Sequence, residues 1–155
     1  MTGARPGRFR RLLIEFPASL AALAVAVVVE IGLRVTTLPR LAGALGTPLA
    51  VTSGGLPDTM SGTRPAQLTP HARRQVRATR RVMRHWPFGD TCLRQALVSG
   101  QRLRRLQPTL HVGVAKIDGE IRAHAWLTIG GGVLDPLAAA ASYLDLTTPE
   151  PRTGP

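Results

Sequence analysis

The stretch TCLRQALVSGQRLRRLQPTLHVGVAKIDGEIRAHAWLTIGGGVLD (residues 91–135) decides the fold, because the spacing of its apolar residues changes near its middle. In the first part, apolar residues recur every three or four positions, as they do on one face of a helix. Asp90 or Thr91 can cap this helix, which is predicted to run to about Arg105. The residues expected on its buried face are Leu93, Ala96, Leu97, Gly100, Leu103 and Leu106.

In the second part the period is two, which is typical of strands with two different faces. His111–Ile117 and Ile121–Ile129 are predicted to pair through the Asp-Gly turn between them, and Val133–Asp135 forms a short third strand after three glycines. One face of the second strand is aliphatic, whereas the other carries Arg122, His124, Trp126 and Thr128. A helix followed by a small antiparallel sheet predicts an α+β fold.

A second helix with two unlike faces is predicted upstream, where Thr69 and Pro70 form a typical helix start. Its apolar stripe consists of Ala72, Val76, Thr79, Met83 and Trp86. The opposite face carries Arg73, Arg74, Arg77, Arg80, Arg81 and Arg84. This face is either simply solvated or binds an acidic peptide or a partner protein, with Arg77 and Arg81 as the candidate contacts. No motif of a nucleic-acid reader accompanies it.

The N-terminal region contains an uncharged run, Phe16–Val29, which ends at Glu30. This run is shorter than the roughly 20 apolar residues that cross a bilayer, so a helix that is buried or lies on a membrane is favoured over a span or a signal peptide. A short helix, Leu38–Leu45, follows. The predicted organisation is an N-terminal helical segment (1–45), a flexible linker rich in Gly, Pro, Ser and Thr (46–68), a catalytic core (69–146) and a disordered tail (147–155).

Composition limits the partners and the kind of site. The 155 residues include 20 basic and 9 acidic ones, a net charge of +11, which favours acidic partners, although the near-exclusive use of Arg also fits a coding bias. The single cysteine excludes an intramolecular disulfide and a Cys-rich zinc site. We expect no metal and no cofactor. A lone cysteine without a convincing export signal places the chain in the cytoplasm.

Cys92, His124 and Asp135 are the candidate catalytic residues. Cys92 lies in the first turn of its predicted helix, where unpaired N–H groups and the helix dipole favour a thiolate. Arg94 and Arg84 add to this effect if they face the sulfur. The alternative is a small packed side chain. Asp135 is expected beside His124 and able to orient its imidazole; otherwise these two are a structural histidine and a turn residue. A nucleophile, a base and an orienting acid are the groups that acyl transfer through a thioester requires.

The segments TCLRQALVSGQRLRRL and LHVGVAKIDGEIRAHAWLTIGGGVLDP resemble the transglutaminase-like cysteine proteases of lasso-peptide biosynthesis. The combination of AHAW with an upstream CL is the specific part of this likeness, which spans roughly residues 10–140. The resemblance implies a papain/transglutaminase-like core, with the cysteine at a helix N-terminus packed against a small antiparallel sheet. It also implies Cys92 as the nucleophile, His124 as the base and Asp135 as the orienting acid, with Trp126 as a candidate substrate contact.

The function that this resemblance implies is removal of the leader from a ribosomally synthesised precursor peptide. The implied partners are the precursor, a small separate leader-recognition protein and an asparagine-synthetase-like, ATP-dependent cyclase, without nucleic acid. Two alternatives stay open. One is a transglutaminase-like peptidase or acyltransferase that acts on another peptide. The other is a non-catalytic basic adaptor that binds nucleic acid, or a membrane surface through residues 16–29, with Cys92 merely packed.

Overall fold

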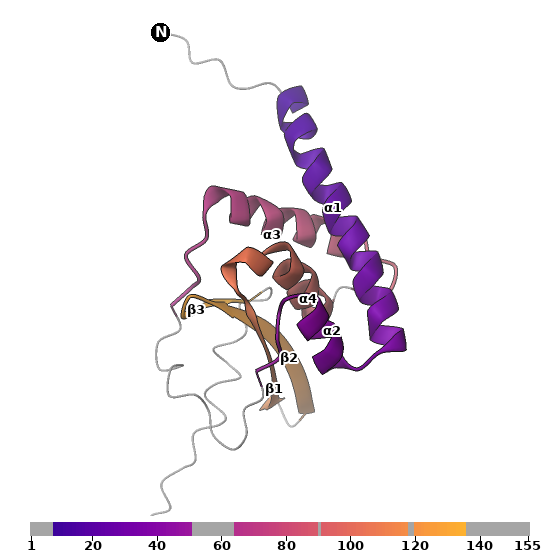
Figure 1. Cartoon of the computed structure of the whole chain (residues 1–155), viewed down its shortest axis with the longest axis vertical. Coiled ribbons are helices and arrows are strands. Elements are labelled where there is room, and N and C mark those ends of the chain that lie inside the picture. Colours follow the sequence, from indigo (N-terminus) through magenta and orange to yellow (C-terminus); the bar gives the residue numbers. More distant parts are fainter. Residues whose placement is uncertain (1–7, 51–63, 90, 118–119, 136–155) are drawn as a thin grey trace, which may run out of the picture.

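The computed structural model describes residues 8–50, 64–89, 91–117 and 120–135. Within these ranges, helices cover a small antiparallel sheet (Figure 1), which confirms the predicted α+β fold. The helices are α1 (Arg8–Val35), α2 (Leu38–Ala44), α3 (Pro70–Met83) and α4 (Cys92–Arg102), and a 3₁₀ turn follows α4 at Arg104–Leu106. The strands are β1 (Thr109–Ile117), β2 (Glu120–Ile129) and β3 (Gly132–Leu134).

The sheet has the order β1-β2-β3, and both pairs of neighbours are antiparallel. In the long β1–β2 hairpin, His111 lies opposite Trp126 and Gly113 lies opposite His124. The Asp-Gly turn predicted between the two strands lies outside the described residues. The third strand ends at Leu134, so Asp135 directly follows the strand in which it was predicted.

The helix α4 occupies the centre of the domain, packed against β1, β2, α1 and α3. Thr91 caps it, since the threonine hydroxyl accepts the Arg94 N–H at 3.4 Å. The core around it combines buried residues from every layer: Ala26, Val29, Leu41, Ala42, Leu45, Met83, Ala96, Leu97, Val98, Leu110, Ala125 and Leu127. Leu106 is 38% exposed, contrary to the prediction, because the 3₁₀ turn has a different period from the helix and ends its apolar stripe early.

The helix α3 has the two faces that its sequence predicts. Ala72, Val76, Thr79 and Met83 are buried, and Trp86 beyond the helix end is half-buried. The Thr69 hydroxyl accepts the Ala72 N–H at 3.2 Å, which confirms the expected cap. All six arginines of the opposite face are exposed.

Both described ends of segment 46–68, the predicted flexible linker, are hydrogen-bonded to the sheet. At one end, the Ala50 N–H donates to the Leu110 carbonyl and the Leu110 N–H to the Pro48 carbonyl, at 2.8 and 2.9 Å. At the other end, the Val133 N–H donates to the Arg64 carbonyl, and the Val133 carbonyl accepts from the Ala66 N–H. Residues 51–63, and likewise the predicted tail 147–155, lie outside the described residues.

The helix α1 is longer and more exposed than the predicted Phe16–Val29 helix. Its inner side buries Ala22, Ala26 and Val29 against α3 and α4. Its outer side exposes Phe16, Leu20, Leu23, Val27, Val28, Ile31 and Val35. The stretch Phe16–Val35 is, by length and composition, apolar enough to cross a membrane, and 28% of it is buried in the protein. The exposed apolar face of α1 continues past Glu30 to Ile31 and Val35, because the Glu30 side chain points into the domain.

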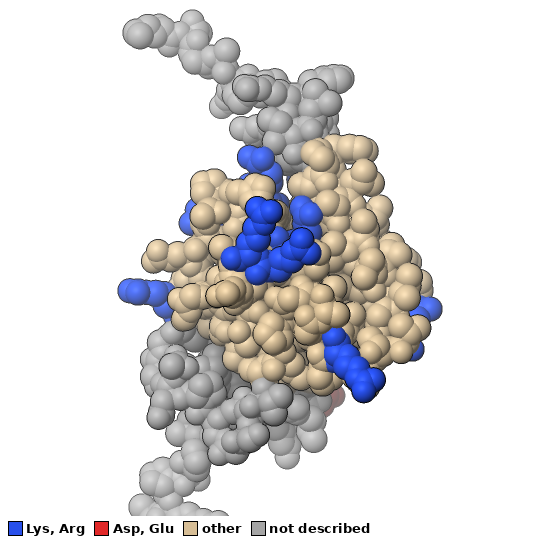
Figure 2. All heavy atoms as spheres, in the orientation of Figure 1, with Lys and Arg blue, Asp and Glu red and all other residues tan. Residues whose placement is uncertain are grey.

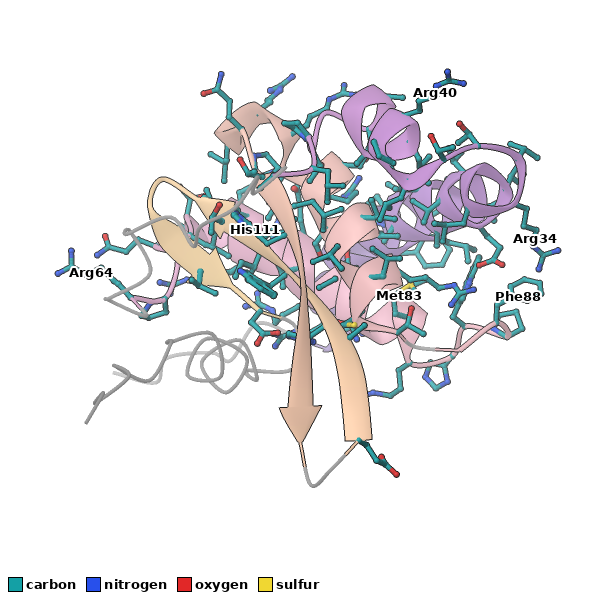
Figure 3. All side chains as sticks on the ribbon, turned by 90° about the horizontal axis from the view of Figure 1, so that it is seen from below. Arg34, Arg40, Arg64, Met83, Phe88 and His111 are labelled. Atoms are coloured by element: carbon teal, nitrogen blue, oxygen red, sulfur yellow. The ribbon has the colours of Figure 1, made fainter. Side chains whose placement is uncertain are left out.

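The Glu30 carboxylate connects α1 to two other parts of the domain. It is 7% exposed, and it accepts hydrogen bonds from the guanidinium of Arg94 at 2.8 Å and from Trp86 Nε1 at 3.5 Å. Arg34 lies one turn later on α1, and its Nη2 is 3.1 Å from Oε1 of Glu30. The guanidinium carbon of Arg34 also lies 4.7 Å from the centroid of the Phe88 ring (Figure 3). The hydrogen bond from Arg94 is the main reason why the pKa of Glu30 lies below its ordinary value.

Replacing Gly100 by Ala is expected to destabilise the protein, although Ala is the better helix former by about 1 kcal/mol. A Cβ at this position of α4 would overlap the side chain of Thr47, which is fully buried and held through its N–H by the Ala42 carbonyl. We expect a net loss of about 1–3 kcal/mol in the free energy of unfolding, measured by urea titration.

The matched control is Gly43→Ala in α2, where nothing lies within 4 Å of the added Cβ. This variant should be as stable as the parent, or more stable by up to about 1 kcal/mol. Equal effects of the two substitutions would show that Thr47 does not restrict the space at Gly100.

Replacing Glu30 by Gln is expected to lower stability in a way that depends on pH. The folded-state pKa of Glu30 lies below the ordinary 4.5, so its ionic contacts stabilise the fold above pH 4.5, and this contribution is lost as the pH falls through the folded-state pKa. The difference in unfolding free energy between parent and variant should therefore be largest near neutral pH and shrink below pH 4.5. Urea titrations across this range test it, and a difference that stays constant down to pH 3 would contradict it.

Candidate functional site

His124 and Asp135 form a nearly buried pair on neighbouring chain segments of the sheet. His124 Nε2 lies 2.9 Å from Asp135 Oδ1, and the two side chains are 2% and 6% exposed. The strand register explains the contact. Leu134 lies opposite Leu127, so Asp135 comes level with Trp126 and diagonal to His124 on the same face of the sheet. The structure thus brings together two of the three predicted catalytic side chains.

The tautomer of the His124 imidazole follows from this hydrogen bond. A carboxylate can only accept, so Nε2 of His124 carries the proton that it donates to Asp135. In the neutral ring, Nδ1 is then the basic nitrogen, and it is the one that can exchange a proton with a nucleophile. This is the arrangement of a general base oriented by an acid.

Trp126 supports His124 from the side. Its ring stacks on His124 with centroids 5.9 Å apart, and on His111 of β1 with centroids 5.6 Å apart and an interplanar angle of 9°. The Trp126 side chain is thereby almost fully buried, at 5% exposure. This stacking restricts rotation of the His124 imidazole, and a contact of Trp126 with the substrate stays a prediction.

His111 and Gly113 belong to this site and were not singled out from the sequence. His111 Nε2 lies 2.9 Å from the hydroxyl of Thr128, and burial lowers the pKa of His111 below its ordinary value, so its ring is neutral near pH 7. Figure 3 shows His111 on the sheet. Gly113, opposite His124, leaves room for Trp126, because a Cβ there would lie 2.9 Å from its ring. Counting outward from the predicted Asp-Gly turn would have found both residues.

Cys92 is the first residue of α4, the helix that packs on β2. It is partly buried against the hydrophobic core, and it is the free cysteine of the chain. The N–H groups of Cys92 and Leu93 have no acceptor within the helix, because they belong to its first turn. Arg94 does not act as a free cation beside the sulfur, as the sequence suggested, since it is paired with Glu30. The approach of the sulfur to His124 stays a prediction.

The arginine face of α3 lies beside the His124–Asp135 pair but is not part of it. Arg80 donates to the backbone carbonyl of Asp135 at 3.5 Å, which connects α3 to the site. Arg77 and Arg81 are exposed on the helix. Figure 2 shows arginine side chains gathered on this face of the molecule over α3 and α4. Binding of a partner or a peptide by Arg77 and Arg81 stays a prediction.

The described part of the chain contains no cluster of side chains that could bind a metal ion. Within it, no group of three or more His, Cys, Asp or Glu side chains is placed to hold a metal ion.

Comparison with known proteins identifies one family. The family model of the transglutaminase-like superfamily matches residues 25–148, which is most of the chain. The match includes the second half of α1, all of α2, and the elements that carry Cys92, His124 and Asp135. Comparisons with curated proteins and with solved structures give no match.

If His124 activates the thiol, iodoacetamide should alkylate Cys92 faster than it alkylates a model cysteine peptide near neutral pH. His124→Ala should slow this reaction by about tenfold or more, because the thiolate loses its base. The rates are measured by mass spectrometry of the intact folded protein. His85→Ala, which removes an exposed histidine, is the control and should leave the rate unchanged. A thiol no more reactive than the peptide would contradict the catalytic role and favour a packed Cys92.

Proposed function

Because this chain belongs to the transglutaminase-like superfamily, whose members are typically cysteine peptidases or acyltransferases, we propose that it is a cysteine peptidase. We further propose that its substrate is a lasso-peptide precursor, from which it removes the leader. The observation that carries the proposal is the 2.9 Å hydrogen bond between Asp135 and His124, a residue of the strand β2 that packs against the helix beginning at Cys92. These are the groups that thioester chemistry requires.

In the proposed reaction, Nδ1 of His124 takes the proton of the Cys92 thiol, and the sulfur attacks the carbonyl carbon of the last leader residue. N–H groups in the first turn of α4 stabilise the oxyanion that forms. The C–N bond then breaks, His124 returns the proton to the departing amine of the core peptide, and the leader stays on Cys92 as a thioester. Water activated by His124 hydrolyses this thioester and releases the leader acid.

Asp135 has a defined task in this cycle. Its carboxylate keeps the proton of His124 on Nε2 and stabilises the imidazolium that exists between the two proton transfers. The stack of Trp126 and His111 restricts rotation of the imidazole, so the ring is already oriented before the substrate binds. This preorganisation lowers the entropy cost of the reaction.

The choice of substrate rests on the sequence resemblance. The CL pair that opens α4, the AHAW of β2 and the terminal VLD resemble, in order and spacing, the motifs of lasso-peptide leader peptidases. The proposed partners are the precursor peptide, a separate leader-recognition protein and an ATP-dependent cyclase that uses the freed amine. Arg77 and Arg81 are proposed to contact one of these partners. We propose a cytoplasmic location, where the outer face of α1 can lie against a membrane surface.

The test is to incubate the protein with its precursor peptide and the leader-binding protein and to follow leader release by mass spectrometry. Cys92→Ala and His124→Ala should each abolish release, because they remove the nucleophile and the base. Asp135→Ala should lower the rate by about 10²-fold or more, because the imidazole loses its orientation. Thermal unfolding of each variant checks that the fold is kept.

His85→Ala is the matched control and should cleave at the parent rate. Full cleavage by Cys92→Ala would refute the mechanism. Addition of a small primary amine distinguishes hydrolysis from acyl transfer: a leader released mainly as its amide would make the protein an acyltransferase and contradict the peptidase proposal.

A further inference from the structure

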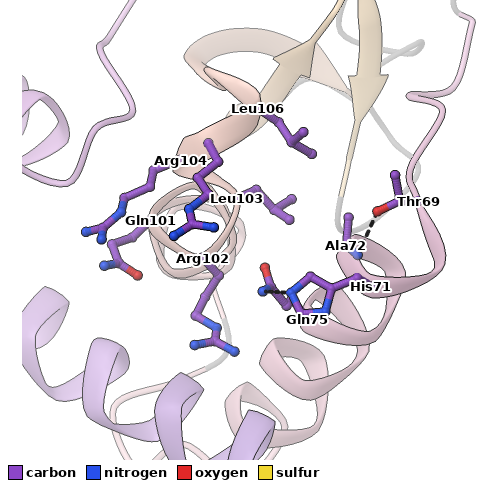
Figure 4. A pocket seen from close by; sticks show the side chains of 10 residues that line it. Thr69, His71, Ala72, Gln75, Gln101, Arg102, Leu103, Arg104 and Leu106 are labelled. Carbon is purple, nitrogen blue, oxygen red and sulfur yellow. Dashed lines mark hydrogen bonds between the residues drawn. The ribbon is translucent and has the colours of Figure 1, made fainter.

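A second candidate site lies at the end of α4 that is remote from Cys92. A cavity of about 470 Å³ opens between the first turns of α3 and the end of α4 with its 3₁₀ turn (Figure 4). Cys92 and Arg102 are the first and last of the 11 residues of α4, so the two ends of this helix lie about 15 Å apart. The polar side chains that line the cavity are Thr69, His71, Gln75, Gln101, Arg102, Arg104 and Arg105.

The lining is strongly basic, with three arginines and no acidic residue. Arg102 is the central one: its Nε is buried and has no hydrogen-bond partner in the described part of the chain, and burial lowers its pKa. This contrasts with Arg34 and Arg94, whose guanidinium groups are both paired with Glu30. A buried guanidinium N–H without an acceptor is unfavourable. A ligand oxygen in the cavity relieves this cost once the Arg102 side chain turns its Nε toward the cavity.

The other polar groups around Arg102 suit the same kind of ligand. The amide nitrogen of Gln75 lies 2.7 Å from His71 Nε2, so the amide donates to this nitrogen and the ring carries its proton on Nδ1 (Figure 4). His71 also lies in the first turn of α3, a 14-residue helix whose positive dipole end favours an anion. The negative dipole end of α4 opposes this attraction, and its effect is offset by Arg102, Arg104 and Arg105.

We propose that this cavity binds an anionic oxygen group, a carboxylate or a phosphate, held by Arg102 with support from His71 and the neighbouring arginines. The volume is within the range of small-molecule and cofactor sites, and it also accommodates an acidic side chain of a bound peptide. Planar guanidinium groups bind both kinds of oxyanion through paired hydrogen bonds. The proposal is independent of the peptidase activity, since it uses none of the residues of the His124 site.

The test is isothermal titration of the full chain with two probes, inorganic pyrophosphate and an end-blocked tetraglutamate peptide, at matched ionic strength. At least one probe should bind. Arg102→Gln should weaken this binding by about tenfold or more, because a charged hydrogen-bond donor is lost. Gln75→Glu should abolish it, because the new carboxylate occupies the cavity next to the arginines. Arg64→Gln, which removes an exposed arginine outside the cavity, is the control and should change affinity less than twofold.

The two probes distinguish the sources of the anion. Preference for pyrophosphate identifies a phosphate-bearing ligand, preference for the peptide identifies an acidic segment of a bound chain, and either result supports the site. Gln75→Glu keeps the test decisive if Arg102→Gln does not fold. Absence of binding at millimolar probe would overturn the proposal. A loss of affinity in Arg64→Gln equal to that in Arg102→Gln would also overturn it, since only the net positive charge would then be acting.

Discussion

The ion pair between Glu30 and Arg94 is the constraint on which the arrangement of this domain depends. The charge of a carboxylate that is only 7% exposed must be compensated by hydrogen bonds or opposite charges. The partners of Glu30 are Arg34 of α1, Trp86 after α3 and Arg94 in the first turn of α4. Three separate parts of the chain are thereby held at one point. This is why α1 is an integral part of the domain, in agreement with a family match that begins inside it.

The same ion pair lies next to the proposed nucleophile. Arg94 is two residues from Cys92, so its contact with α1 holds the start of α4 in place, while the tight packing of Gly100 on Thr47 holds the other end. The imidazole is held separately, between the ring of Trp126 and the carboxylate of Asp135. The proposed nucleophile and the proposed base are therefore each positioned by an independent set of contacts, and the helix–sheet packing sets the relation between them.

Sequence predictions were most accurate for features that depend on interactions between residues close together in the chain. The observed register of β1 and β2 is the one that a two-residue turn at the predicted Asp-Gly implies. The positions of His111 and Gly113 opposite Trp126 and His124 were therefore contained in the sequence, although only the structure drew attention to them. Leu106 was placed wrongly, because helical periodicity does not show where an α-helix changes to a 3₁₀ turn.

The sequence by itself determined the elements, their two faces and the residue types of the site, because periodicity, caps and turns act over a few residues. Only the tertiary structure decided that Glu30 points inward to Arg94, that the described ends of segment 46–68 pair with the sheet, and that Nε of Arg102 has no hydrogen-bond partner among the described residues. These features depend on contacts between residues far apart in the chain. Composition carries no information about which of 20 basic residues meets the one inward-facing carboxylate of α1 in the described structure.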